Sequence, residues 1–188
     1  MKQDHRTVEQ LFEQFEEAEE SEQGEIAERV CQLLTVHAQI EEEILYPAAK
    51  EAFSDEEDND LVNEAQVEHT SAKELIAKIE GMTPEDETFK ATVKVLSEYI
   101  KHHVKEEEGE LFPELKKTEL DLKEMGGQLM NRKLELMEQM GIEEDEEASD
   151  DRKAPAKRSR SSGSSRSAAK SGARGRSSSK RGGSRASR

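Results

Sequence analysis

The sequence contains no tryptophan, a single cysteine and no long apolar run, and each absence removes a class of protein. Cys31 alone cannot form an intramolecular disulfide, and one thiol excludes iron–sulfur and structural zinc sites that need several thiolates. No apolar stretch approaches the length that crosses a bilayer, and the N-terminal MKQDHRTVEQ has no apolar signal-peptide region. We therefore expect a cytoplasmic protein with no membrane partner.

Aromatic residues and prolines are also scarce, and what replaces them favours helix. Aromatics make up 4% of the chain and there are four prolines, whereas 38% of residues are charged and 32% hydrophobic. Long runs of Glu, Lys, Leu, Gln and Ala are typical of helices. With so many charges the core must be narrow, so we predict an all-α helix bundle.

The net charge of −16 combines two opposite parts. Residues 1–148 contain 42 acidic and 15 basic residues, a charge of −27, whereas residues 149–188 contain 2 and 13, a charge of +11. The basic part is mostly Ser, Arg, Lys, Gly and Ala, too polar to bury a core. We predict a helical domain over residues 1–141 and a disordered tail over 142–188.

Apolar residues at helical spacing predict five helices. The fifth, from about Leu120 to Met140, is an extra helix within residues 119–141, beyond a core of residues 1–118, and the Gly126-Gly127 pair could divide it. The first four are expected to start at the following places: Asp4, near Gly24, after a cap at Ser54, and at Thr83-Pro84.

Part of this pattern is duplicated. His37 to Pro47 reads HAQIEEEILYP and His103 to Pro113 reads HVKEEEGELFP, so a His-x-x-x-Glu pair, a leucine, an aromatic and a proline recur at equal offsets. A further histidine lies 32 residues before the first copy and 34 before the second, at His5 and His69. Four of the five histidines thus occupy equivalent points of a duplicated helical hairpin.

The duplicated residues have the chemistry of a metal site. His and Glu at i and i+4 share one helix face, and here they stand where the apolar stripe should continue. A buried glutamate is costly unless it is paired or binds a metal. Any one of these histidines could be an ordinary core residue, but four recurring with two glutamates suit two six-coordinate iron or manganese ions.

The chain resembles the hemerythrin-like HHE cation-binding family over roughly residues 1–140. The resemblance rests on the histidines and glutamates in DHRTVEQLF, HAQIEEEILYP, EHTSAKEL and HVKEEEGELFP. It implies an antiparallel four-helix bundle with a non-haem centre of two oxo- or hydroxo-bridged irons, and roles in binding or sensing O₂, NO, peroxide or iron. The metal ligands that it implies are His5, His37, Glu41, His69, His103 and Glu107.

One position departs from the family. The O₂-carrying hemerythrins have a second histidine four residues after the one on the third helix, and here that position is Lys73. One metal therefore lacks an imidazole, which leaves a coordination site open or lets another oxygen ligand in. The change argues against reversible O₂ carriage and favours reaction with peroxide or plain iron binding.

Residues near the expected site have simpler interpretations too. His102 points about 100° away from His103 around the helix and is expected to be exposed. Tyr99, one turn before His103, could reach the metal, although a buried tyrosine with an ordinary hydrogen bond is commoner. A set of glutamates is expected to form a solvated acidic face, in which one could help iron to enter: Glu42, Glu43, Glu106, Glu108 and Glu110.

The basic tail suits contacts with phosphates independent of sequence, or a linker or solubility role. It contains no aromatic residue for base stacking. The cations that we single out are Lys157, Arg158, Arg160, Arg174, Arg176, Lys180 and Arg181.

Three functions remain open from the sequence. The first is a di-iron protein that binds or senses a small ligand in oxidative stress response. The second is a catalase-like enzyme that decomposes H₂O₂. The third is an iron-binding protein that associates with DNA at the nucleoid through its basic tail and protects it.

Overall fold

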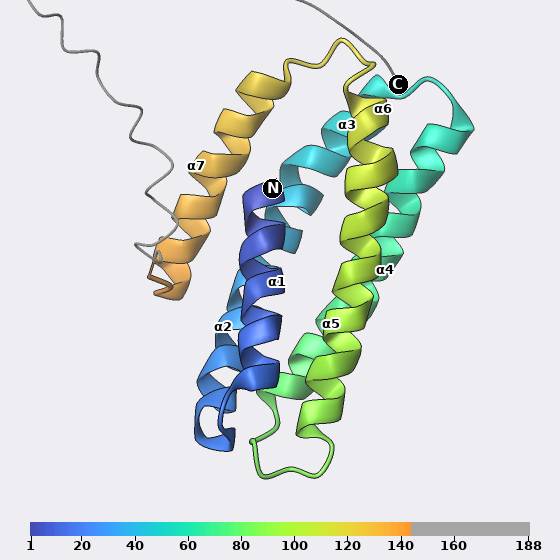
Figure 1. Ribbon diagram of the computed structural model, residues 1–188. Helices are drawn as coiled ribbons and strands as arrows, with labels where there is room; N and C mark the ends of the chain where they lie inside the picture. Colours follow the sequence, from blue (N-terminus) through green and yellow to red (C-terminus); the bar gives the residue numbers. More distant parts are fainter. Residues whose placement is uncertain (144–188) are drawn as a thin grey trace, which may run out of the picture. The chain divides into compact units, whose positions relative to one another are not determined.

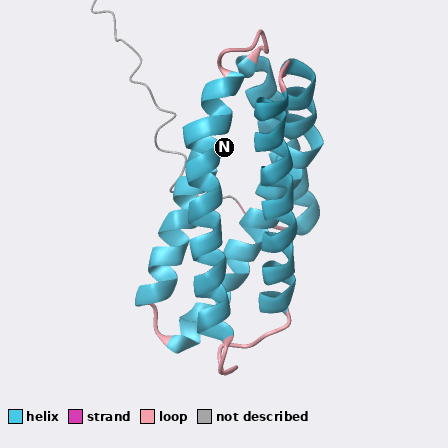
Figure 2. Cartoon of the chain, turned by 90° about the vertical axis from the view of Figure 1, so that its right-hand side faces the viewer, coloured by secondary structure: helices cyan, strands magenta, loops and turns pink. Residues whose placement is uncertain are grey.

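The computed structural model describes residues 1–143, and these are helical apart from short connections (Figure 2). None of the helices described is both long and apolar enough to cross a bilayer. The elements in chain order are α1 (Lys2–Glu17), α2 (Glu20–Ile40), the π-helix η1 (Glu41–Leu45), α3 (Tyr46–Ala52), α4 (Glu56–Glu80), α5 (Phe89–Glu106), the π-helix η2 (Glu107–Leu111), α6 (Phe112–Leu115) and α7 (Leu122–Met140).

Four long helices form the bundle. Helices α1, α2, α4 and α5 run side by side, and the short connections pair α1 with α2 and α4 with α5 as antiparallel hairpins (Figure 1). This arrangement confirms the predicted all-α four-helix bundle with an additional C-terminal helix. The predicted tail lies outside the described residues, apart from its first two positions.

The bundle core is divided into two apolar clusters. One joins α1, α2, α4 and α5 around Phe12, Leu34 and Leu96, and the other lies around Ile40, Tyr46 and Leu129. The four repeated histidines lie where the two clusters meet. Cys31 is buried in the first cluster.

Two helices continue through π turns that the sequence did not predict. In η1 the Tyr46 amide donates to the Glu41 carbonyl, and in η2 the Phe112 amide donates to the Glu107 carbonyl. Each turn is followed by a proline at the second position of the next helix. Proline lacks an N–H and crowds the carbonyl one turn earlier, so a local widening keeps the helix continuous.

The fourth bundle helix begins later than predicted. We expected it to start at Thr83-Pro84, but residues 82–88 form turns and α5 begins at Phe89. The Asp86 carboxylate accepts from the Thr83 amide at 2.7 Å and faces its hydroxyl at 3.3 Å. The capping interaction that the sequence indicated thus closes a turn of the connection instead of starting the helix.

The extra helix α7 is continuous through Gly126-Gly127, which does not divide it as the sequence allowed. It is capped by Asp121, ends at Gly141 in the left-handed conformation (φ 66°), and packs against α2 and η1. Two ion pairs tie it to the bundle: Lys133 Nζ lies 2.6 Å from Asp4, and Arg132 Nε lies 2.6 Å from Glu43. Helix α7 is therefore linked to the residue beside His5.

Candidate metal centre

The six residues expected to bind metal come together in the bundle interior. Four helices each supply one histidine, and η1 and η2 each supply the glutamate at their first position. All six side chains belong to residues that are at most 7% exposed. These six residues are His5, His37, Glu41, His69, His103 and Glu107.

In the first half of the site, the imidazoles of α1 and α2 meet the carboxylates. His5 Nε2 lies 3.0 Å from His37 Nε2 and 3.2 Å from Glu107 Oε2. His37 Nε2 lies 3.2 Å from Glu41 Oε1. Potential ligand atoms from these four residues all lie within 4.8 Å of one another, which is close enough to surround one ion.

The second half is built from α4 and α5. His69 Nε2 lies 3.3 Å from Glu41 Oε2 and 3.3 Å from His103 Nε2. Glu41 thus faces a histidine of each hairpin with a different oxygen. A carboxylate with that placement can bridge two ions.

The donor set fits a pair of cations. Neither carboxylate oxygen of Glu41 or Glu107 has a hydrogen-bond partner among the described residues, although all four oxygens are buried. Buried carboxylates without hydrogen bonds are strongly unfavourable. Cations among the four inward Nε2 atoms would satisfy these oxygens, and imidazole with carboxylate is a set that iron, manganese and zinc accept.

A carboxylate lies behind each imidazole, at its other nitrogen. Glu108 is 2.8 Å from His5 Nδ1, Glu42 is 3.1 Å from His69 Nδ1, and Glu68 is 2.7 Å from His103 Nδ1. Asp4 lies 3.6 Å from His37 Nδ1, an ion-pair distance. Such acceptors fix which nitrogen carries the proton and aim the other at a metal.

The sequence prediction missed these four carboxylates. Glu42 and Glu108 were assigned to a solvated acidic face, which is wrong for both, because each contacts a buried histidine. A signal was present: Asp4 and Glu68 directly precede the lone histidines, and Glu42 and Glu108 directly follow the two repeated glutamates.

Burial and charge separate the pKa values of the two central glutamates. Burial, and next the neighbouring Glu107 carboxylate, raise the pKa of Glu41 well above its usual range. Burial also acts to raise the pKa of Glu107, but the adjacent His5 imidazole and the other imidazoles nearby outweigh it and hold this pKa at about 2. A proton shared by the metal-free pair therefore resides on Glu41.

The tyrosine at the site is Tyr46, and not Tyr99 as considered from the sequence. Tyr46 is fully buried with its hydroxyl 3.1 Å from His69 Nε2. Tyr99 is partly buried against the apolar cluster of the bundle. At the equivalent position of the other half, Phe112 stacks on His5 with ring centroids 6.2 Å apart.

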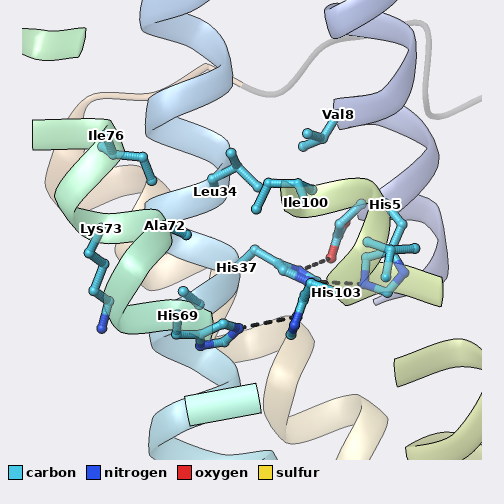
Figure 3. A pocket seen from close by; sticks show the side chains of 13 residues that line it. His5, Val8, Leu34, His37, His69, Ala72, Lys73, Ile76, Ile100 and His103 are labelled. Atoms are coloured by element: carbon cyan, nitrogen blue, oxygen red, sulfur yellow. Dashed lines mark hydrogen bonds and ion pairs between the residues drawn. The ribbon is translucent and has the colours of Figure 1, made fainter. Parts of the chain in front are cut away.

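A small cavity lies on one side of the imidazoles. Its walls are largely aliphatic, with Val8, Leu34, Ile76 and Ile100 next to the histidines (Figure 3). About 20 Å³ is open to the centre of a water-sized sphere, which is room for about one water molecule. Lys73 also lines it.

Lys73 does not replace the histidine of the O₂ carriers with another metal ligand. Its Nζ donates to both oxygens of Glu42, at 2.7 and 2.6 Å. It therefore holds the carboxylate that faces His69. His102 is half-exposed, as predicted, and pairs with Glu106 at 3.1 Å.

Comparison with known proteins identifies relatives for the bundle. The model of the hemerythrin HHE cation binding domain matches residues 1–115. A protein of Nostoc sp. strain PCC 7120 named DNA nickase is 33% identical over 79 residues, which are 42% of this chain and 21% of that protein. The match thus spans about a fifth of that relative. No solved structure matches significantly.

Proposed function

Because the chain belongs to the hemerythrin HHE cation-binding family, we propose that it is a non-haem di-iron protein whose centre takes a small ligand. Manganese is the alternative metal. The observation that carries this proposal is the set of four buried carboxylate oxygens without hydrogen bonds, enclosed by four inward imidazole nitrogens. The proposed ligands are His5, His37, Glu41, His69, His103 and Glu107.

The cavity beside the imidazoles supports a ligand the size of O₂, NO or peroxide. Its volume suits a ligand of one or two heavy atoms and not an organic substrate, and its walls are largely aliphatic. Bound iron would supply the redox chemistry. The chain's own contribution is to hold three imidazoles, those of His5, His69 and His103, by hydrogen bonds at Nδ1. It also lines the ligand cavity with aliphatic side chains, as a sensor or protective protein in oxidative stress requires.

The test is metal analysis with an optical spectrum of the protein as purified, followed by anaerobic iron loading and addition of O₂, NO or H₂O₂. We expect two irons per chain and a near-ultraviolet band that responds to the added ligand. His37→Ala and Glu107→Ala should lower the metal content sharply, whereas His102→Ala should retain two ions. One tightly bound zinc with no iron-dependent spectrum would refute the proposal. Repeated turnover of H₂O₂ would identify the catalase-like function.

A second candidate function concerns nucleic acid, and two observations favour it: the basic composition of residues 149–188 and the similarity to a protein named DNA nickase. We propose that the tail binds duplex DNA through phosphates, regardless of sequence, and keeps iron bound near DNA. The body, at −27, repels the same DNA, so the isolated tail should bind better than the full chain.

Gel shifts at low salt test this candidate. Truncation after Ala148 should abolish binding and leave the metal content unchanged. The logarithm of the affinity of the full chain should fall with the logarithm of salt by about 0.9 per phosphate contact. If the full and truncated chains shift DNA alike, the tail is a linker or solubility segment.

A further inference from the structure

One histidine is not used by the duplicated site. His102 and Glu106 on α5 repeat the His-x-x-x-Glu spacing of His103 and Glu107, displaced by one residue. The equivalent residues of the other hairpin are Val36 and Ile40, both 1% exposed. The outer pair therefore breaks the symmetry of the duplication on one face of the bundle.

We propose that Glu68, His102 and Glu106 form a second, exchangeable metal site that collects a divalent cation from solvent and delivers it to the central site. His102 Nε2 lies 3.1 Å from Glu106 Oε1 and 3.8 Å from Glu68 Oε1. Bonds of about 2.1 Å to one ion separate its ligand atoms by about 3 to 4 Å. One atom from each residue lies within 4.8 Å of the others.

The accessibility of these side chains suits exchange. The His102 side chain is 57% exposed and that of Glu106 is 31% exposed, whereas that of Glu68 is 9% exposed. Three protein ligands leave positions for water, so an ion here would be held loosely. Imidazole with two carboxylates suits Fe²⁺, Mn²⁺ or Zn²⁺.

Glu68 joins the outer cluster to the centre. Its Oε1 faces His102, while its Oε2 accepts from His103 Nδ1 at 2.7 Å. The Glu68 carboxylate would therefore be the single group between a cation bound at its Oε1 and the His103 imidazole of the central site.

A cavity continues from this cluster to the central carboxylates. Its polar wall is formed by Glu64, Glu68, Glu106, His103 and Glu107, and about 20 Å³ is open to the centre of a water-sized sphere. Glu107 is 2% exposed and neither of its oxygens has a hydrogen-bond partner among the described residues. The carboxylates at the outer end of the cavity attract cations. At the inner end, the Glu107 carboxylate has no hydrogen-bond partner among the described residues and could bind the incoming cation.

The inference rests on the proposed metal centre, and the experiment separates the two. The metal-free full-length wild type and the His102→Ala/Glu106→Gln variant are each mixed with two equivalents of Fe²⁺ per chain in a stopped-flow instrument. The final metal content is measured after long incubation. Glu98→Gln, which removes an exposed charge elsewhere on α5, is the matched control.

We expect the variant to load about tenfold more slowly than wild type and the control, yet to reach the same two ions per chain. Titration with Mn²⁺, followed by electron paramagnetic resonance, should show a third, weaker ion in wild type and the control only. Equal loading rates and equal stoichiometry in all three proteins would overturn the outer site while leaving the centre intact. Absence of bound metal from all three would overturn the centre and this inference together.

Discussion

At the scale of single residues, the carboxylates that lie at the Nδ1 atoms of the four central histidines follow the same duplication as the proposed ligands. They are Asp4, Glu42, Glu68 and Glu108. The residue before each lone histidine faces the second histidine of its own hairpin, as Glu68 faces His103. The residue after each ligand glutamate faces the lone histidine of the other hairpin, as Glu108 faces His5. Each hairpin therefore orients imidazoles of both halves, and a metal bound between them would depend on contacts across the two.

Glu108→Gln tests the role of the carboxylates at the Nδ1 atoms. The amide keeps the shape of the side chain but loses the negative charge that faces His5 Nδ1 at 2.8 Å. We expect metal affinity about 10- to 100-fold weaker, measured by competition with a chelator. Glu110→Gln is the control, because Glu110 is an exposed residue of the same turn. Equal losses in both variants would mean that only overall charge matters.

Acidification should destabilise the metal-free protein through His69. Burial, and next the charge of His103, lower the pKa of His69 to about 4. An unfolded histidine takes up its proton near pH 6.5, so between pH 4 and 6.5 the unfolded state binds more protons and stability falls as pH falls. The loss is at most about 3 kcal/mol at this residue.

Urea unfolding of the metal-free protein at pH 7 and pH 4.5 measures this loss. His69→Gln, which cannot take up the proton, should show a smaller decrease in unfolding free energy than wild type. His102→Gln, at a half-exposed histidine, should behave as wild type. An unchanged pH dependence in His69→Gln would contradict the assigned pKa.

The sequence predicted the proposed ligands because they interrupt apolar stripes at repeated offsets, a pattern that ideal helix geometry preserves. It did not predict Tyr46 at the site, because that geometry does not hold here. On an α-helix Tyr46, five residues after Glu41, lies about 140° around the axis from it. The π turn of η1 changes this offset and brings the Tyr46 hydroxyl to His69. Backbone hydrogen bonding of that kind leaves only an indirect trace in the sequence, the proline six residues after each glutamate.

At the scale of elements, the same π turns set the direction around the helix axis in which the side chains of the following helix, α3 or α6, point. Their equal placement, each starting at a ligand glutamate, makes them part of the site. The helix starts were harder to predict, as the Thr83–Asp86 turn shows, because a cap residue can close a loop as well as begin a helix.

Inserting one alanine after Gly109 should test the helix register that the π turn η2 sets. The turn already holds one residue more than a turn of α-helix, and a second extra residue would rotate Leu111 and Leu115, each 2% exposed, by about 100° out of the core. We expect a loss of about 3 kcal/mol or more in the unfolding free energy. Gly109→Ala is the matched control: its Cβ would meet nothing within 4 Å, and it should stabilise by about 0.5–1 kcal/mol. Thermal melts that fail to separate the two variants would show that this register is not needed.

At the scale of the whole molecule, bound metal should account for a large part of the stability. Metal that binds only the folded bundle stabilises it by mass action. The gain is about 2.7 kcal/mol when the free metal concentration is 100 times the dissociation constant. For a chain of this size that corresponds to roughly 5–10 °C in melting temperature. Chelation should therefore lower the melting temperature of wild type and leave that of His37→Ala unchanged. Coincident melts of the loaded and chelated wild type would contradict the metal assignment.

Each hairpin brings half of the proposed ligands: His5, His37 and Glu41 from the first, and His69, His103 and Glu107 from the second. Metal held by both halves acts on the chain as a cross-link between segments far apart in sequence, and its removal restores the freedom of the two halves to separate. In hydrogen exchange, the metal-free chain should open hairpin by hairpin, with different rates for α1–α2 and α4–α5. With metal bound, the amides of all four helices should exchange together, through the unfolding of the whole bundle.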